Sequence, residues 1–197
     1  APGDFLFCQG TDDYLLTKEE MERLAQDAGF TNMGVIPADH LVFDPSLREY
    51  CEDNLCGNFG KNLSCPPACG TPEEMKTRTE AYETAWIFQT IAEVDWHDAK
   101  ALKAVRDSHN ARSRKLLNRL REEGVAGLAM LAGPCAACEI CAGAEGKPCR
   151  FPEQQISCIS AYCMSAEKMA EEAGLPYWCG EGKVGFFSLY LTGRKEG

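Results

Sequence analysis

The sequence predicts an α/β or α+β fold, in which a single layer of about four strands packs against helices. Two observations predict the layer: apolar strand-like runs alternate with amphipathic helical segments, and 45% of the 197 residues are hydrophobic, enough for one core. A third observation concerns the twelve cysteines, most of which are grouped between the expected elements. Grouping suggests a shared ligand. We therefore expect residues 1–197 to form a single metal-binding domain with two cysteine-rich loops.

The first expected elements are a helix and a strand. "TKEE" at Thr17 to Glu20 is a capping box, in which a threonine hydroxyl and a glutamate satisfy free backbone N–H groups, so it predicts a helix from about Lys18 to Ala28. Gly29 is a natural end for it. The apolar run "FTNMGVIP" then predicts a short strand.

A second helix and a second strand are expected next. "TPEE" at Thr71 to Glu74 repeats the capping box, and Pro72 occupies the first helical position, where its missing N–H donor costs nothing. "TAWIFQTIAEV", over residues 84–94, predicts a buried strand.

The rest of the chain continues this alternation. Residues 97–124 predict a long helix, whose apolar face includes Leu102, Val105, Leu116, Leu117 and Leu120. "VAGLAMLAG", over 125–133, predicts a third strand and "KVGFFSLYLTG", over 183–193, a final one. Between them, "SAEKMAEEAG" predicts a helix capped by a serine.

The composition argues against several classes of partner. The net charge of −10 has the wrong sign for a phosphate-binding surface, so we expect no nucleic acid partner. No apolar run approaches the length of a membrane span, and the opening "APGDFLFCQG" lacks the features of a signal peptide. We therefore expect no membrane contact and a cytoplasmic location.

The second cysteine segment, 135–149, gives the stronger chemical signal. Cys135, Cys138 and Cys141 follow the spacing C-x2-C-x2-C, and Cys149 follows in "PCRFP". This resembles the cysteine run of bacterial ferredoxins, in which successive thiolates bind the irons of a [4Fe–4S] cluster. Zinc sites more often use cysteine pairs separated by a long loop, so zinc is the less favoured alternative. A disulfide framework is disfavoured, because a chain of this length needs no covalent staples.

The first cysteine segment, 51–69, is less regular. Cys51, Cys56, Cys65 and Cys69 are separated by four, eight and three residues, and Pro66 follows one of them as in the ferredoxin run. We expect these four thiols to hold a second cluster. An exchange of ligands between the two segments is an alternative, because the last cysteine of the ferredoxin run can bind the other cluster.

Four cysteines lie outside both segments: Cys8, Cys158, Cys163 and Cys179. A single cysteine is most often a small buried apolar residue. Cys158 and Cys163 nevertheless lie close to the second segment, and either is an alternative to Cys69 as the fourth ligand of the first site.

Three stretches together carry a resemblance to a known family. These are "VIPADHLVFDPSLREYCEDNLCGNFGKNLSCPP", "AGPCAACEICAGAEGKPCRFPE", and "EEAGLPY" with the terminal apolar strand. The chain, from about Leu24 to Gly193, resembles the predicted metal-binding protein family called domain of unknown function 2284.

The resemblance implies a cysteine-rich iron–sulfur protein of a type common in anaerobes, without implying one reaction. The first motif of the family matches Cys51, Cys56 and Cys65, and its second motif matches Cys135, Cys138, Cys141 and Cys149, with Arg150. Cys69, Cys158 and Cys163 lie outside both motifs, so the fourth ligand of the first site stays open.

Three functions are compatible with these features. The first is an electron-transfer protein with one or two [4Fe–4S] clusters and an acidic surface suited to a redox partner with a basic docking face. The second is an interaction module in which zinc or a cluster holds the loops. The third is a cluster-dependent reductase or corrinoid-related enzyme. The sequence does not decide whether the protein is an enzyme.

Overall fold

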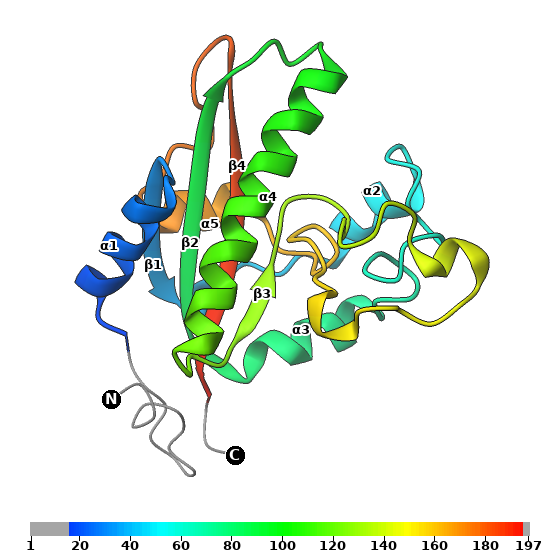
Figure 1. Ribbon diagram of the computed structural model, residues 1–197, viewed down its shortest axis with the longest axis horizontal. Coiled ribbons are helices and arrows are strands. Elements are labelled where there is room, and N and C mark those ends of the chain that lie inside the picture. Colours follow the sequence, from blue (N-terminus) through cyan, green and yellow to red (C-terminus); the bar gives the residue numbers. More distant parts are fainter. Residues whose placement is uncertain (1–15, 195–197) are drawn as a thin grey trace.

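The computed structural model describes residues 16–194, and Cys8 therefore lies outside the described residues (Figure 1). The helices and strands within this range follow the predicted alternation. The helices are α1 (Lys18–Ala28), α2 (Arg48–Glu52), α3 (Pro72–Glu80), α4 (Ala99–Glu122) and α5 (Ala166–Glu172). The strands are β1 (Asn32–Pro37), β2 (Tyr82–Glu93), β3 (Leu128–Met130) and β4 (Lys183–Arg194).

The strands form one sheet in the order β1-β2-β4-β3, and every neighbouring pair is antiparallel. The long strands β2 and β4 occupy the centre and pair over their whole length, with Trp86 opposite Tyr190. An antiparallel sheet covered by helices makes the fold α+β, which confirms the predicted single layer.

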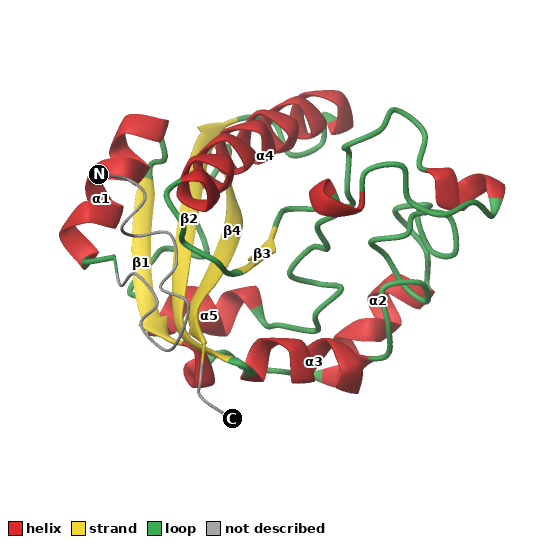
Figure 2. Ribbon diagram, turned by 60° about the horizontal axis from the view of Figure 1, so that its bottom comes forward, coloured by secondary structure: helices red, strands yellow, loops and turns green. Residues whose placement is uncertain are grey.

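Helices cover both faces of this sheet (Figure 2). Along β2, Trp86 and Phe88 point to the face covered by α1 and α4, whereas Ala85 and Ile87 point to the other face. That second face packs against apolar side chains of α3 and α5, including Met75 and Met169. The two-residue alternation of a strand thus produces two apolar cores, one on each side of the sheet.

The predicted helix boundaries are confirmed at the caps. Thr17 and Thr71 both form complete capping boxes, with Glu20 and Glu74 respectively. The helix α1 ends at Gly29, which adopts a left-handed conformation with φ of 86° that glycine accepts without strain.

The third strand is shorter than predicted, because β3 covers Leu128–Met130 rather than 125–133. Before it, Gly127 runs so close to β4 that an added Cβ would lie 2.3 Å from the carbonyl oxygen of Leu191. After it, the side chain of Asn110 in α4 bonds both the N–H and the carbonyl of Ala132. A helix side chain therefore takes over the hydrogen bonds that a longer ladder would have used.

The cysteine segments lie beyond the edge strand β3. In Figures 1 and 2 the loops around residues 50–70 and 134–155 lie together at one end of the molecule, away from the sheet. The first of these is not irregular throughout, since α2 forms within it and carries Cys51. We call residues 48–70 and 134–157 the cysteine lobe, and the rest of the described chain the sheet layer.

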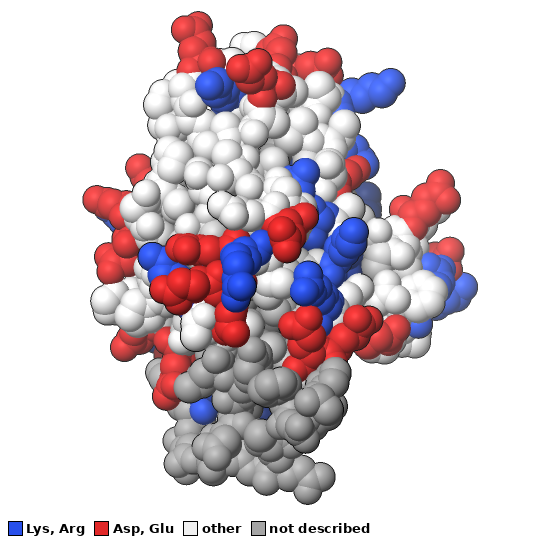
Figure 3. Space-filling model, turned by 60° about the vertical axis from the view of Figure 1, so that its left-hand side comes forward, with Lys and Arg blue, Asp and Glu red and all other residues white. Residues whose placement is uncertain are grey.

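The surface shown in Figure 3 mixes acidic and basic side chains in a belt, below a broad area with few charges. Within residues 16–194, no helix combines the length and the apolar character needed to cross a membrane.

Candidate metal centre

The two cysteine segments are joined by hydrogen bonds from two buried polar side chains. Asn62 donates its amide to the carbonyl of Cys135 at 2.9 Å, and the hydroxyl of Ser64 accepts the N–H of Cys135 at 3.0 Å. Asn62 also accepts the N–H and the hydroxyl of Ser64. The start of the second segment is therefore fixed directly on the first.

The four cysteines of the first segment differ in exposure. Cys51 lies in α2, Cys56 is exposed in the turn that follows, and Cys65 and Cys69 are buried with 7% and 5% exposure. Burial raises the pKa of Cys65 to about 12, and Cys158 adds to the rise, while a hydrogen bond from Ser64 opposes it. Burial also raises the pKa values of Cys51 and Cys69, although Arg48 opposes the rise in both.

Raised pKa values mean that these thiols hold their protons at neutral pH when no metal is bound, even with Arg48 nearby. A bound metal cation would reverse this, because thiolate is the form that binds metal and is stabilised by the positive charge. The first segment therefore concentrates thiols in a place where they become thiolates when a metal pairs with them.

Arg48 organises the base of the first site. Its side chain is 7% exposed, and its guanidinium donates to the carbonyls of Gly70 and Ala161, both at 2.9 Å. These carbonyls belong to the loops that carry Cys69 and Cys158. One buried cation thus holds two thiol-bearing loops together and places positive charge beside them.

Three cysteines of the second segment line a cavity of about 580 Å³. They are Cys135, Cys138 and Cys141, and Cys56 of the first segment also lines it. The cavity wall also includes charged side chains: Lys61, Lys103, Arg106, Asp107 and Glu139.

Two sulfur atoms of this segment accept hydrogen bonds. The N–H of Leu63 donates to Cys141 Sγ at 3.4 Å, and the guanidinium of Arg114 donates to Cys135 Sγ at 3.4 Å. Such donors stabilise negative charge on sulfur and tune the potential of a cluster bound to it.

Cys149 is half-buried and is not among the residues that line the cavity. Its neighbour Arg150 donates to the carbonyl of Ile140 at 2.8 Å and lies 4.0 Å from a carboxylate oxygen of Glu145. Arg150 thereby fastens the end of the segment to the residue before Cys141.

The eight predicted ligands all lie in the cysteine lobe, but their side chains are not arranged around a single metal ion. Among residues 16–194, no three histidine, cysteine, aspartate or glutamate side chains lie close enough to hold one metal ion. Cys158, half-buried, accepts the N–H of Ala161 at 3.4 Å, and Cys163 is fully buried a few residues later. Cys179 is half-buried beside Gln89 of the sheet.

A comparison with protein-family models gives one match. Residues 34–192 match the family described as "Predicted metal-binding protein (DUF2284)". The chain belongs to this family. No curated protein and no solved structure matches the chain. The family match confirms the resemblance seen in the sequence and supports a metal-binding role.

The residues present in this member of DUF2284 fit a metal centre bound by sulfur. The candidate ligands are thiols, several of them buried, and two backbone N–H groups and the guanidinium of Arg114 donate hydrogen bonds to sulfur atoms. Thiolate ligands suit zinc and iron–sulfur clusters and are unsuited to magnesium or calcium.

Sequence reasoning missed the residues that hold this lobe together, above all Arg48, Asn62, Ser64 and Arg114. Asn62 and Ser64 lie between Cys56 and Cys65 and look like ordinary loop residues. Arg48, three positions before Cys51, had a weak local signal: a cation next to a predicted thiolate. Arg114 lies on α4, far from either cysteine segment along the chain, and had no such signal.

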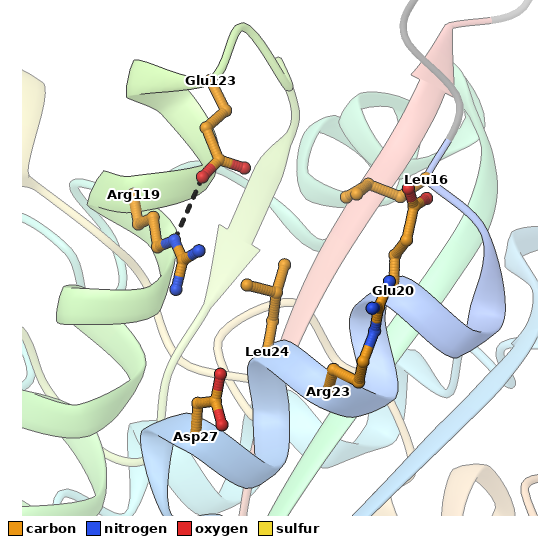
Figure 4. Close-up of a pocket in the computed structure, with 7 residues that line it drawn as sticks. All are labelled: Leu16, Glu20, Arg23, Leu24, Asp27, Arg119 and Glu123. Carbon is orange, nitrogen blue, oxygen red and sulfur yellow. Dashed lines mark hydrogen bonds and ion pairs between the residues drawn. The ribbon is translucent and has the colours of Figure 1, made fainter.

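Another opening lies away from the cysteines. It has a volume of about 300 Å³ between α1 and α4, where Arg119 pairs with Glu123 at 3.0 Å (Figure 4). Its wall mixes Leu16 and Leu24 with charged side chains and holds none of the predicted ligands.

Proposed function

We propose that this protein binds two [4Fe–4S] clusters in the cysteine lobe and transfers electrons to a partner protein. Two such clusters need eight thiolates, and the candidates predicted from the sequence are Cys51, Cys56, Cys65, Cys69, Cys135, Cys138, Cys141 and Cys149. When bound, such clusters accept and release one electron each. The protein's part is to hold them, to set their potential and to present them to the partner.

The observation that carries this proposal is the meeting of the two cysteine segments in one lobe. Asn62 and Ser64 fix Cys135 against the first segment, so the two groups of thiols are neighbours in space although they are distant in sequence. Neighbouring clusters are the arrangement that two-cluster ferredoxins use to pass electrons onward.

The ligand spacing favours clusters over zinc. Three thiols at C-x2-C-x2-C surround one corner of a cubane, whereas structural zinc sites more often use two separated pairs. The donors at Cys135 and Cys141 support the same choice, because hydrogen bonds to sulfur are a principal means of adjusting cluster potential.

The surface of the lobe suits a docking partner. Large apolar side chains are exposed around the cysteines, including Tyr50, Leu55 at 90% exposure, Ile140 and Phe151. Exposed apolar side chains near a redox centre, on a chain of net charge −10, suit a protein partner with a basic docking face. We place this exchange in the cytoplasm.

The test is anaerobic purification followed by iron, acid-labile sulfide and zinc analysis. We expect about eight irons and eight sulfides per chain, and electron paramagnetic resonance signals that appear on reduction with dithionite and disappear on reoxidation. Stoichiometric zinc without sulfide would instead identify a structural interaction module. Clusters that cannot be reduced and reoxidised would contradict electron transfer.

The cavity favours a cluster-dependent reductase as a second candidate. A volume of about 580 Å³ lined by Cys135, Cys138 and Cys141 could admit a small molecule next to a cluster. A small-molecule reductant or oxidant that alters the spectrum of one cluster alone would favour this enzyme over simple electron transfer.

A further inference from the structure

Resting on the proposed function, we infer that Cys158, and not Cys56, completes the first cluster site together with Cys51, Cys65 and Cys69. Cys158 belongs to neither predicted segment. The inference assigns the exposed thiol of Cys56 to the cavity of the second segment instead.

The chain around Cys158 is attached to the first segment at several points. The amide of Gln155 donates to the carbonyl of Leu63 at 2.9 Å, and Arg48 bridges the carbonyls of Gly70 and Ala161. Hydrogen bonds thus fasten the Cys158 loop to the Cys65–Cys69 loop on both sides of the thiol.

Burial separates Cys158 from Cys56. Cys158 packs against the same apolar cluster that contains Cys69, and the N–H of Ala161 fixes its sulfur at 3.4 Å. Cys56 is exposed and lines the cavity with Cys135, Cys138 and Cys141. A sulfur held by a backbone donor among buried thiols is better prepared to be a ligand than one on an exposed turn.

The thiols themselves show the same grouping. Cys158 lies within electrostatic range of Cys51, Cys65 and Cys69. Cys56 also lies near Cys51 and Cys65, so burial and the hydrogen bonds of the loops distinguish Cys158 from it.

The position of Cys158 also explains how a ligand can come from so far along the chain. It pairs with Leu131, directly after β3, in an isolated parallel bridge. The sheet edge therefore fixes Cys158, and the cysteine lobe folds back onto it. A cluster bound there would join the lobe to the sheet layer.

The experiment isolates the first site by removing the second cluster with Cys138→Ser. In this background, Cys158→Ala should lose the remaining four or so irons, whereas Cys56→Ala should keep them. Cys163→Ala is the matched control, because it removes a buried thiol from the same loop and should also keep them. Iron, sulfide and the paramagnetic signal of the reduced protein are the measurements.

The outcomes separate this inference from the proposed function. Retention of the cluster in the Cys158 variant, with loss in the Cys56 variant, would overturn the inference while leaving the iron–sulfur proposal intact. The absence of iron and sulfide from the parent protein would contradict both the inference and the iron–sulfur proposal.

Alkylation of the unmodified holoprotein covers the case in which the Cys158 variant does not fold. Iodoacetamide should label Cys56 before the iron is removed and Cys158 only afterwards, as read by peptide mass spectrometry. Once the iron is removed, Cys158 should be labelled faster than Cys163. Labelling of Cys158 in the loaded protein would contradict its role as a ligand.

Discussion

The sheet layer and the cysteine lobe are stabilised by different kinds of side chain. In the sheet layer the fully buried side chains are mostly large and apolar, such as Phe88, Ile87 and Leu120. The buried residues of the lobe are instead mainly polar groups and thiols: Arg48, Asn62, Ser64, Cys65 and Cys69, with Pro66, Ala142 and Ile156. Half of the exposed large apolar residues of the described chain lie in the lobe. The sheet layer therefore has its own apolar core, whereas the lobe is held together largely by hydrogen bonds between polar groups.

Removal of the metal should produce the largest difference between the two regions. Because metal binding contributes folding energy to loops that lack an apolar core, we expect amide exchange in 48–70 and 134–157 to become at least roughly 100-fold faster after anaerobic chelation. The central strands β2 and β4 should keep their protection. Hydrogen exchange with mass spectrometry measures both regions in one sample. Equal acceleration in the lobe and the central strands would show that the sheet layer has no independent stability.

The second prediction compares one buried residue from each region. Arg48→Met leaves the carbonyls of Gly70 and Ala161 without their shared donor, so we expect it to cost about 3 kcal/mol and to lower the iron content. Phe88→Ala removes a large side chain from the core of the sheet layer and should cost about 3–5 kcal/mol. Iron per folded molecule should stay unchanged in the Phe88 variant. Denaturant titration and metal analysis of the folded fraction test the pair, and a loss of iron in both variants would contradict the separation.

The same contrast explains what the sequence could predict. The caps at Thr17 and Thr71 and the apolar periodicity of 84–94 are local signals, and the structure confirms the elements that they predicted. The length of β3 depended on Asn110, a helix residue that no local pattern connects to Ala132. Within the lobe, spacing identified the cysteine segments. Their spatial grouping depends on Arg48, Asn62 and Ser64, which act between segments distant in sequence.

The smallest effect should come from His109, which belongs to the sheet layer alone. Its side chain is 0% exposed between α4 and the sheet, where its Nδ1 lies 2.7 Å from the hydroxyl of Thr90 and Phe30 packs against its ring. Burial lowers the pKa of His109 to about 4, and the nearby Arg112 lowers it further, although a backbone contact with Phe187 opposes them.

A histidine whose pKa is lowered on folding is protonated in the unfolded chain before it is protonated in the folded one. Between pH 6.5 and about 4 the unfolded state therefore binds more protons, and stability falls as the pH falls. From pH 7 to pH 5 the free energy of unfolding should therefore fall by about 2 kcal/mol.

The variant His109→Gln, which can keep a hydrogen bond to Thr90, should remove this pH dependence, whereas the exposed His97→Gln should retain it. Metal release from the lobe also depends on pH, but it affects all three proteins alike, so the difference in slope between the His109 variant and the others reports on the sheet layer. Identical slopes in denaturant titrations of all three proteins would mean that His109 does not remain neutral in the folded core.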